Sequence, residues 1–356
     1  MFAVIVGANT DPEKVTGKVD TANLPVLRAA PDLEPVGWIN TEPISGRELR
    51  GKVVLYDFWT YSCVNCRRTF PYLQSWYDRY RSAGLVLIGI HSPEFDFERI
   101  HHNVEDAVKR DDVTWPVALD DHMAIWNEFE NRYWPADYIA DRDGNIRYTH
   151  FGEGDYTNTE DVIRRLLGVP AASPRAAPVG GGGDTTSPEH NPETYLGAQY
   201  QSAGQPLIAL RPGAFDYPVP EPGSIAPPEF GADGSVALRR GRTTAALVGK
   251  WTVDEEKATS DAAVATILLA AHAKEVNLVM ATADGRAHDV IVQLDGQPVP
   301  AELRGDDVHE DENGRTVVSV HAPDMYRLFA SPTVENHLLS ISTTGPGLEA
   351  YSFTFG

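Results

Sequence analysis

Two cysteines, Cys63 and Cys66, carry the clearest chemistry in the chain, and they are the only cysteines among its 356 residues. Both lie in the segment DFWTYSCVNCR, between an apolar run and a helical pattern. A cysteine at the start of a helix faces free backbone N–H groups and the positive end of the helix dipole, which favour the thiolate. We therefore predict that Cys63 is the nucleophile and that Cys66, one helical turn further on, resolves its mixed disulfides.

A structural bridge, two idle buried thiols and a zinc site are the alternatives to a redox-active pair. A bridge that closes so short a loop constrains the unfolded chain little. Zinc would need further ligands at a suitable spacing, but His101 and His102 are adjacent and point apart by about 100° on a helix. The sequence therefore predicts redox chemistry with no metal and no cofactor.

The elements around the pair alternate between strand-like and helix-like patterns, which predicts an α/β layer structure over residues 33–169. Residues 1–32 form an N-terminal extension. The predicted strands are residues 53–59 and 85–91, followed by a hairpin of residues 137–140 and 146–151 around Asp143-Gly144. The predicted helices are residues 67–81, 97–110 and 159–167.

A second domain follows a linker. Residues 170–192 are rich in Pro, Gly, Ala and Ser, which is typical of a linker. Beyond it, residues 193–356 contain short β-prone runs separated by Asp-Gly and Asn-Gly turns, which predicts an all-β, jelly-roll-like sandwich. These runs are residues 263–271, 276–281, 290–294, 316–321, 338–343 and 350–355.

The net charge of −21 argues against nonspecific binding to nucleic acid or to an anionic membrane. No run approaches the ~18 apolar residues that would span a bilayer. The apolar run at residues 2–6 lacks the basic lead and the length of a secretory signal, so the sequence itself does not indicate export.

The segment around the cysteines resembles the thioredoxin fold, in particular its TlpA-like and DipZ-like members. The most similar stretches are residues 62–67, 91–95, 133–135 and 351–356, and the resemblance extends from about residue 33 to the C-terminus, apart from the linker. The dipeptide between the cysteines, Val64-Asn65, lacks the proline of ordinary thioredoxin.

The resemblance implies roles for several residues. Asp57 matches a buried carboxylate that is thought to move a proton to the resolving cysteine, although an exposed strand-end Asp is the alternative. Pro135 matches a cis-proline that faces the cysteine pair, and an ordinary trans proline is its alternative. A substrate groove would then include Trp59, Val64, Asn65 and Trp134.

The resemblance also implies partners and a location. Relatives of this kind act outside the cytoplasm on oxidised thiols of exported proteins, with a possible role in cytochrome c maturation. A membrane part similar to the electron carrier CcdA keeps them reduced, so the protein would be tethered to the membrane. In DipZ relatives the second domain looks like a carbohydrate-binding module.

Two rival functions remain open. Thr60 and Cys63 form a T-x-x-C element like that of peroxiredoxins, although Tyr56 stands where that family has proline. The chain could instead be an adaptor that binds cell-wall glycans through aromatic side chains. The candidates are Tyr195, Tyr200, Tyr217, Trp251 and Tyr326, most of which we expect to lie in the core. The acidic loop at residues 306–313 could bind Ca²⁺, but it lacks EF-hand spacing and is more typical of a solvated turn.

Overall fold

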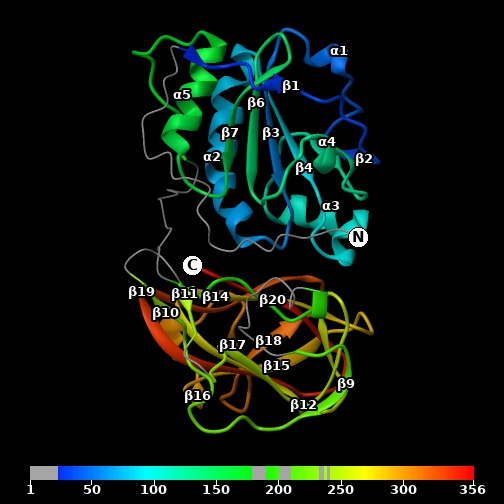
Figure 1. Cartoon of the computed structure of the whole chain (residues 1–356), viewed down its shortest axis with the longest axis vertical. Helices are drawn as coiled ribbons and strands as arrows, with labels where there is room; N and C mark the ends of the chain where they lie inside the picture. Colours follow the sequence, from blue (N-terminus) through cyan, green and yellow to red (C-terminus); the bar gives the residue numbers. More distant parts are fainter. Residues whose placement is uncertain (1–22, 179–189, 200–209, 232–235, 239–240) are drawn as a thin grey trace. The chain divides into compact units, whose positions relative to one another are not determined.

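The computed structural model describes residues 23–178, 190–199, 210–231, 236–238 and 241–356 (Figure 1). Residues 23–178 lie in one compact unit, and the described residues from 190 onward lie in a second unit. Residues 179–189 of the predicted linker and the candidate Tyr200 lie outside the described residues.

The first unit is built on a seven-stranded sheet, counted over the described residues, with strand order β1-β7-β6-β3-β4-β5-β2. The strands are β1 Arg28–Ala29, β2 Gly37–Ile39, β3 Val53–Trp59, β4 Leu85–His91, β5 Val117–Leu119, β6 Ala136–Ala140 and β7 Asn145–Phe151. The α-helices are α1 Gly46–Leu49, α2 Val64–Tyr80, α3 His101–Arg110, α4 Ala124–Glu128 and α5 Tyr156–Leu167, with 3₁₀ turns η2 Arg81–Ala83 and η3 Asp96–Arg99. This is a thioredoxin-like fold, as the sequence predicted.

The central strand β3 explains why the sheet has helices on both faces. All seven of its side chains are buried, and it pairs in parallel with β4 and antiparallel with β6. On one face Trp59 packs edge-on against Phe70 of α2. On the other face Phe58 packs against Trp126 of α4 and the neighbouring Phe129. A strand that is apolar on both faces needs this double cover.

The helix boundaries differ from the prediction at their first residues, because capping groups determine where a helix begins. Helix α2 begins at Val64 rather than residue 67, since the Cys63 sulfur caps it by accepting the backbone N–H of Cys66 at 3.2 Å. The helix predicted at residues 97–110 is divided into η3 and α3 at Ile100.

The beginning of the predicted linker is bound to the first unit. Arg164 of α5 is buried, and its guanidinium donates to the carbonyl oxygens of Pro170, Ser173 and Pro174. The Ala176 N–H donates to the Glu160 carboxylate at 2.8 Å. Ordered contacts of the first unit therefore continue past residue 169, where the sequence predicted the domain to end.

The second unit consists mostly of strands. They are β8 Thr194–Tyr195, β9 Gly213–Tyr217, β10 Glu229–Phe230, β11 Val236–Ala237, β12 Ala245–Val253, β13 Ala258–Ser260, β14 Thr266–Thr282, β15 His288–Leu294, β16 Gln297–Pro298, β17 His309–Glu310, β18 Thr316–Val320, β19 Asp324–Thr343 and β20 Leu348–Phe355, with the 3₁₀ turn η5 Ala301–Leu303. Over the described residues, eleven of them form one hydrogen-bonded sheet around an apolar core, and β10 and β11 pair separately.

Two long strands replace several of the short ones that were predicted. The runs at residues 263–271 and 276–281 fall on the single strand β14, which pairs with β19 along most of its length. The pairing shifts register between Ala273 and Glu275, and a bulge of this kind bends a strand. Before the shift β14 pairs with β12, and after it β14 pairs with β20, so the sheet folds back on itself.

Candidate active site

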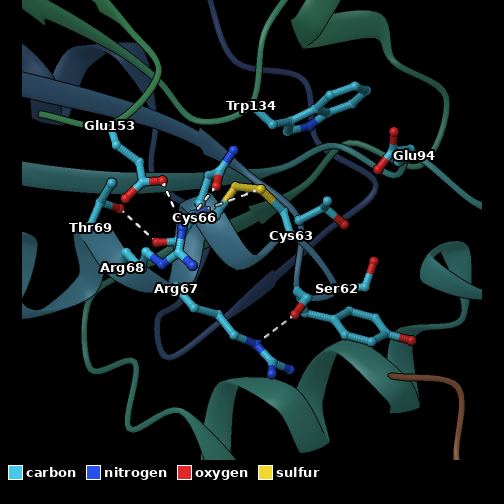
Figure 2. The surroundings of a disulfide bond; sticks show 12 residues. Ser62, Cys63, Cys66, Arg67, Arg68, Thr69, Glu94, Trp134 and Glu153 are labelled. Atoms are coloured by element: carbon cyan, nitrogen blue, oxygen red, sulfur yellow. Dashed lines mark hydrogen bonds and ion pairs between the residues drawn. A yellow bond between two sulfur atoms is a disulfide. The ribbon is translucent and has the colours of Figure 1, made fainter. Parts of the chain in front are cut away.

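The cysteine pair lies at the amino end of α2, directly after β3. Cys63 and Cys66 form a disulfide with 5.3 Å between their Cα atoms (Figure 2). Cys66 is fully buried, whereas Cys63 is only partly buried. An incoming disulfide can therefore reach the sulfur of Cys63 more easily than that of Cys66.

The surroundings of the pair favour a thiolate. The first turn of α2 contains no acidic residue, and Arg67 and Arg68 follow Cys66 directly. Arg67 donates to the Tyr61 carbonyl at 2.9 Å, and Arg68 pairs with Glu153 at 3.2 Å, which keeps both cations near the helix start (Figure 2). A helix N-terminus with nearby arginines lowers the pKa of a cysteine thiol.

A buried carboxylate holds the loop that delivers Cys63. Glu98 is fully buried and accepts hydrogen bonds from the Ser62 hydroxyl at 2.6 Å and from the N–H groups of Glu94 and Phe95 at 2.6 and 3.0 Å. Burial raises the pKa of Glu98, and these hydrogen bonds oppose that rise. Sequence reasoning missed Glu98, because nothing local distinguishes it from a solvated acid on the helix predicted there.

His91 was also missed by sequence reasoning. Its ring is buried, stacks on Tyr61 with 5.8 Å between centroids, and lies 3.4 Å from the Thr60 hydroxyl. Burial lowers the pKa of His91 to about 3, so the imidazole is neutral at physiological pH. It supports the loop before Cys63 as a neutral packing group.

Asp57 lies on β3 and is 1% exposed, which excludes the alternative of an exposed strand-end carboxylate. Burial, with a smaller contribution from the charge of Asp137, raises the pKa of Asp57 well above its ordinary range. A carboxyl group with a raised pKa can exchange protons near neutral pH. Asp137, its neighbour on β6, did not stand out in the sequence.

The peptide bond between Trp134 and Pro135 is cis. The Trp134 indole donates to the Ser92 carbonyl at 3.0 Å and packs on Trp126 with 4.1 Å between ring centroids. Figure 2 shows Trp134 among the residues that surround the disulfide. These contacts fix the side chain that precedes Pro135.

Two of the predicted groove residues are misplaced. Trp59 is fully buried between Phe70 and His91, and Val64 is 5% exposed, so neither side chain lines a surface groove. Both lie close to the cysteines in sequence, but every side chain of β3 is buried and Val64 lies on the buried face of α2. Asn65 is exposed, and its side-chain oxygen accepts a hydrogen bond from Arg68 at 3.4 Å.

Two of the four described candidates for sugar contact are buried. Trp251 is 0% exposed and Tyr326 is 4% exposed, so neither ring can stack on a sugar. Tyr195 and Tyr217 are partly buried.

In the acidic loop, Asp306 and Asp311 pair with Arg327 and Arg315. Within the described ranges, no group of three or more His, Cys, Asp or Glu side chains is placed to hold a metal ion.

Two family matches cover the two units. Residues 26–149 match the AhpC/TSA family, and residues 191–356 match the family described as the thioredoxin-like C-terminal domain. Together with the cysteine pair, these matches make the chain similar to the thioredoxin-like thiol–disulfide oxidoreductases.

Within that class, similarity to one named relative extends along nearly the whole chain. The chain is 35% identical over 348 residues to Protein DipZ of Mycobacterium bovis, which covers 94% of this chain and 44% of that protein. The chain thus spans less than half the length of this relative.

Smaller relatives match over a shorter range. Thiol-disulfide oxidoreductase YkuV of Bacillus subtilis is 27% identical over 130 residues, which cover 36% of this chain and 87% of that protein. Thiol-disulfide oxidoreductase ResA of Bacillus cereus is 26% identical over 165 residues, which cover 46% of this chain and 87% of that protein. Among the described residues, none of the helices combines the length and apolarity needed to cross a bilayer.

Proposed function

We propose that this protein reduces disulfides of exported proteins through Cys63 and Cys66. The observation that supports it most is the geometry of the pair, with an accessible Cys63 capping a helix and a buried Cys66 one turn further on. The Cys63 thiolate attacks one sulfur of the partner disulfide and releases the other as a thiolate. A mixed disulfide then joins Cys63 to the partner.

Cys66 completes the reaction. It loses its proton to Asp57 and attacks the Cys63 sulfur, which breaks the mixed disulfide and frees the second partner thiol. The partner gains two electrons, and the enzyme is left with the disulfide between Cys63 and Cys66. In this proposal Pro135 and Trp134 form the wall that receives the extended substrate chain, with the exposed Asn65 at its edge.

The cycle needs an electron donor that reduces the disulfide again. Following the resemblance to DipZ-like proteins, we assign this role to a membrane carrier similar to CcdA, and we place the protein outside the cytoplasm and tethered to the membrane. Cytochrome c maturation is the cellular process that we propose for it.

A thiol peroxidase fits the site less well. Thr60 would have to offer its hydroxyl beside the Cys63 thiolate, but this side chain is fully buried and faces His91 at 3.4 Å. We therefore favour disulfide exchange.

For the second unit we propose a jelly-roll-like sandwich, supported by the sheet that folds back at β14. We propose no sugar ligand for it, because Trp251 and Tyr326 are buried.

The reduction potential of the pair tests the direction of this chemistry. We expect equilibration with glutathione buffers, followed by thiol alkylation, to give a value near the roughly −270 mV of a reductant such as thioredoxin. A value near roughly −120 mV would make the pair an oxidant and overturn the proposal.

A further inference from the structure

Three titratable side chains lie in a row across the first sheet. In the antiparallel pairing of β3 with β6, Asp57 is directly opposite Asp137, and in the pairing of β6 with β7, Asp137 is directly opposite His150. Directly opposite residues share a face of the sheet, with Cβ atoms about 4.5–5.5 Å apart. The row therefore runs from beneath the cysteine helix toward the strands at the edge of the sheet.

The two carboxyl groups are incompletely paired. Asp57 Oδ2 and Asp137 Oδ1 are both buried, and neither has a hydrogen-bond partner in the described part of the chain. Asp57 is sealed from solvent, whereas Asp137 is partly exposed. Asp137 is thus the less buried residue of the pair.

Among the described residues, the positions paired with Asp57 on β4 and with Asp137 on β7 offer no cation to offset these charges. On β4, Asp57 pairs with Gly89, which has no side chain. The indole N–H groups of Trp59 and Trp115 lie beside Gly89. On the β7 side, burial lowers the pKa of His150, which leaves it neutral.

The other titratable groups near the pair are neutral or already paired. Burial raises the pKa of Tyr148 on β7, and the charge of Asp137 adds to that rise. On α2, Arg68 is paired with Glu153. Burial raises the pKa of Asp137 to about 7, so two ionised carboxylates side by side are unfavourable at neutral pH.

We propose that Asp57 and Asp137 share a single proton and that Asp137 relays protons between this buried pair and solvent while Cys66 resolves a mixed disulfide. The inference deepens the proposed function and rests on it. Asp57 receives the thiol proton, and Asp137 is a positioning residue that acts through Asp57.

The proton balance of the step is as follows. Before resolution the pair holds one proton and one negative charge. The Cys66 thiol transfers its proton to the pair, which becomes neutral, and the Cys66 thiolate attacks the Cys63 sulfur. The bond between Cys63 and the partner breaks as the bond between Cys63 and Cys66 forms, and the partner leaves as a thiolate. Asp137 then releases one proton to water or to that thiolate, which restores the charge of the pair.

The test separates attack from resolution in the full chain. Reduced protein is mixed with 5,5′-dithiobis(2-nitrobenzoate) in a stopped-flow instrument. The first chromophore release reports attack by Cys63 and depends on reagent concentration, whereas the second reports resolution by Cys66 and does not. Asp137→Asn and Asp57→Asn are compared with Asp78→Asn, an exposed aspartate on α2.

For Asp137→Asn we expect the second phase to slow by about tenfold or more at pH 7, less than the roughly 10²–10⁴-fold typical of a lost general acid or base, because Asp137 acts through Asp57. The pH midpoint of the second phase should also shift. The rate of the first phase should match wild type, and so should the rates of the Asp78→Asn control. Asp57→Asn should slow the second phase at least as much, and the double variant should be no slower than Asp57→Asn alone.

The outcomes distinguish this inference from the proposed function. If Asp57→Asn slows resolution while Asp137→Asn keeps the wild-type rate and pH midpoint, the relay is wrong and the proposed function survives. If Asp57→Asn also resolves at the wild-type rate, the assigned role of Asp57 fails and the relay fails with it. A wild-type protein without a second phase would overturn the proposed function itself.

A measurement on the wild-type protein covers the case in which the variants fail to fold. In a ¹³C NMR titration of the aspartate carboxyl carbons, a proton-sharing pair shows two midpoints common to both residues. A single midpoint for Asp137 near the ordinary value of about 4, with no second step, would overturn the proposal.

Discussion

Cys66→Ser should accumulate a covalent mixed disulfide with its partner proteins, whereas Cys63→Ser should capture none. The reason is that Cys63 is the more accessible sulfur at the helix start, while Cys66 is buried and acts only after the first exchange. Cys63→Ser should also lose disulfide reductase activity by roughly a thousandfold or more, as other enzymes do on losing a covalent nucleophile. Insulin reduction and non-reducing electrophoresis after acid quenching measure the two effects.

The two variants serve as controls for each other, because each removes one sulfur from the same helical turn. The reverse pattern, with Cys63→Ser capturing partners and Cys66→Ser capturing none, would exchange the two roles. Equal capture by both variants would mean that accessibility does not decide which sulfur attacks.

Asp57→Asn should make the protein more stable than wild type at high pH. Because burial raises the pKa of Asp57, the folded state keeps a proton that the unfolded chain loses near pH 4. The stabilising contribution of Asp57 is therefore complete below about pH 4 and is lost as the pH rises through the folded pKa. The free energy of unfolding of Asp57→Asn should therefore increase relative to that of wild type between pH 4 and pH 8.

Urea unfolding of the oxidised proteins between pH 4 and pH 8 measures this difference without interference from thiol titration. Asp78→Asn on the exposed face of α2 is the matched control. If the difference for Asp57→Asn were constant across this range, Asp57 would titrate normally in the folded protein.

The sequence was sufficient to predict the strands and helices that carry the cysteines, because local signals determine them. A buried apolar run, a CxxC segment and an amphipathic helix follow one another, and β3 and α2 lie where that order predicts them. The start of α2 differed by three residues, since the cap is the Cys63 sulfur itself.

The site residues that the sequence did not reveal depend on contacts between residues that are far apart in the sequence. Asp137 becomes relevant only through its register with Asp57, 80 residues earlier, and Glu98 only through its bond to Ser62, 36 residues earlier. No local pattern marks such an acid as buried. The same limit explains why Trp59 was placed in a groove, since proximity in sequence does not reveal that helices cover both faces of β3.

The acidity of the Cys63 thiol tests the central claim most directly. The titration uses the Cys66→Ala variant, so that Cys63 is the only thiol. Thiolate absorbance near 240 nm is followed as the pH is raised. A helix N-terminus with two adjacent arginines predicts a pKa below about 7.5. A midpoint at the ordinary value of about 8.5 would contradict the assignment of Cys63 as an activated nucleophile.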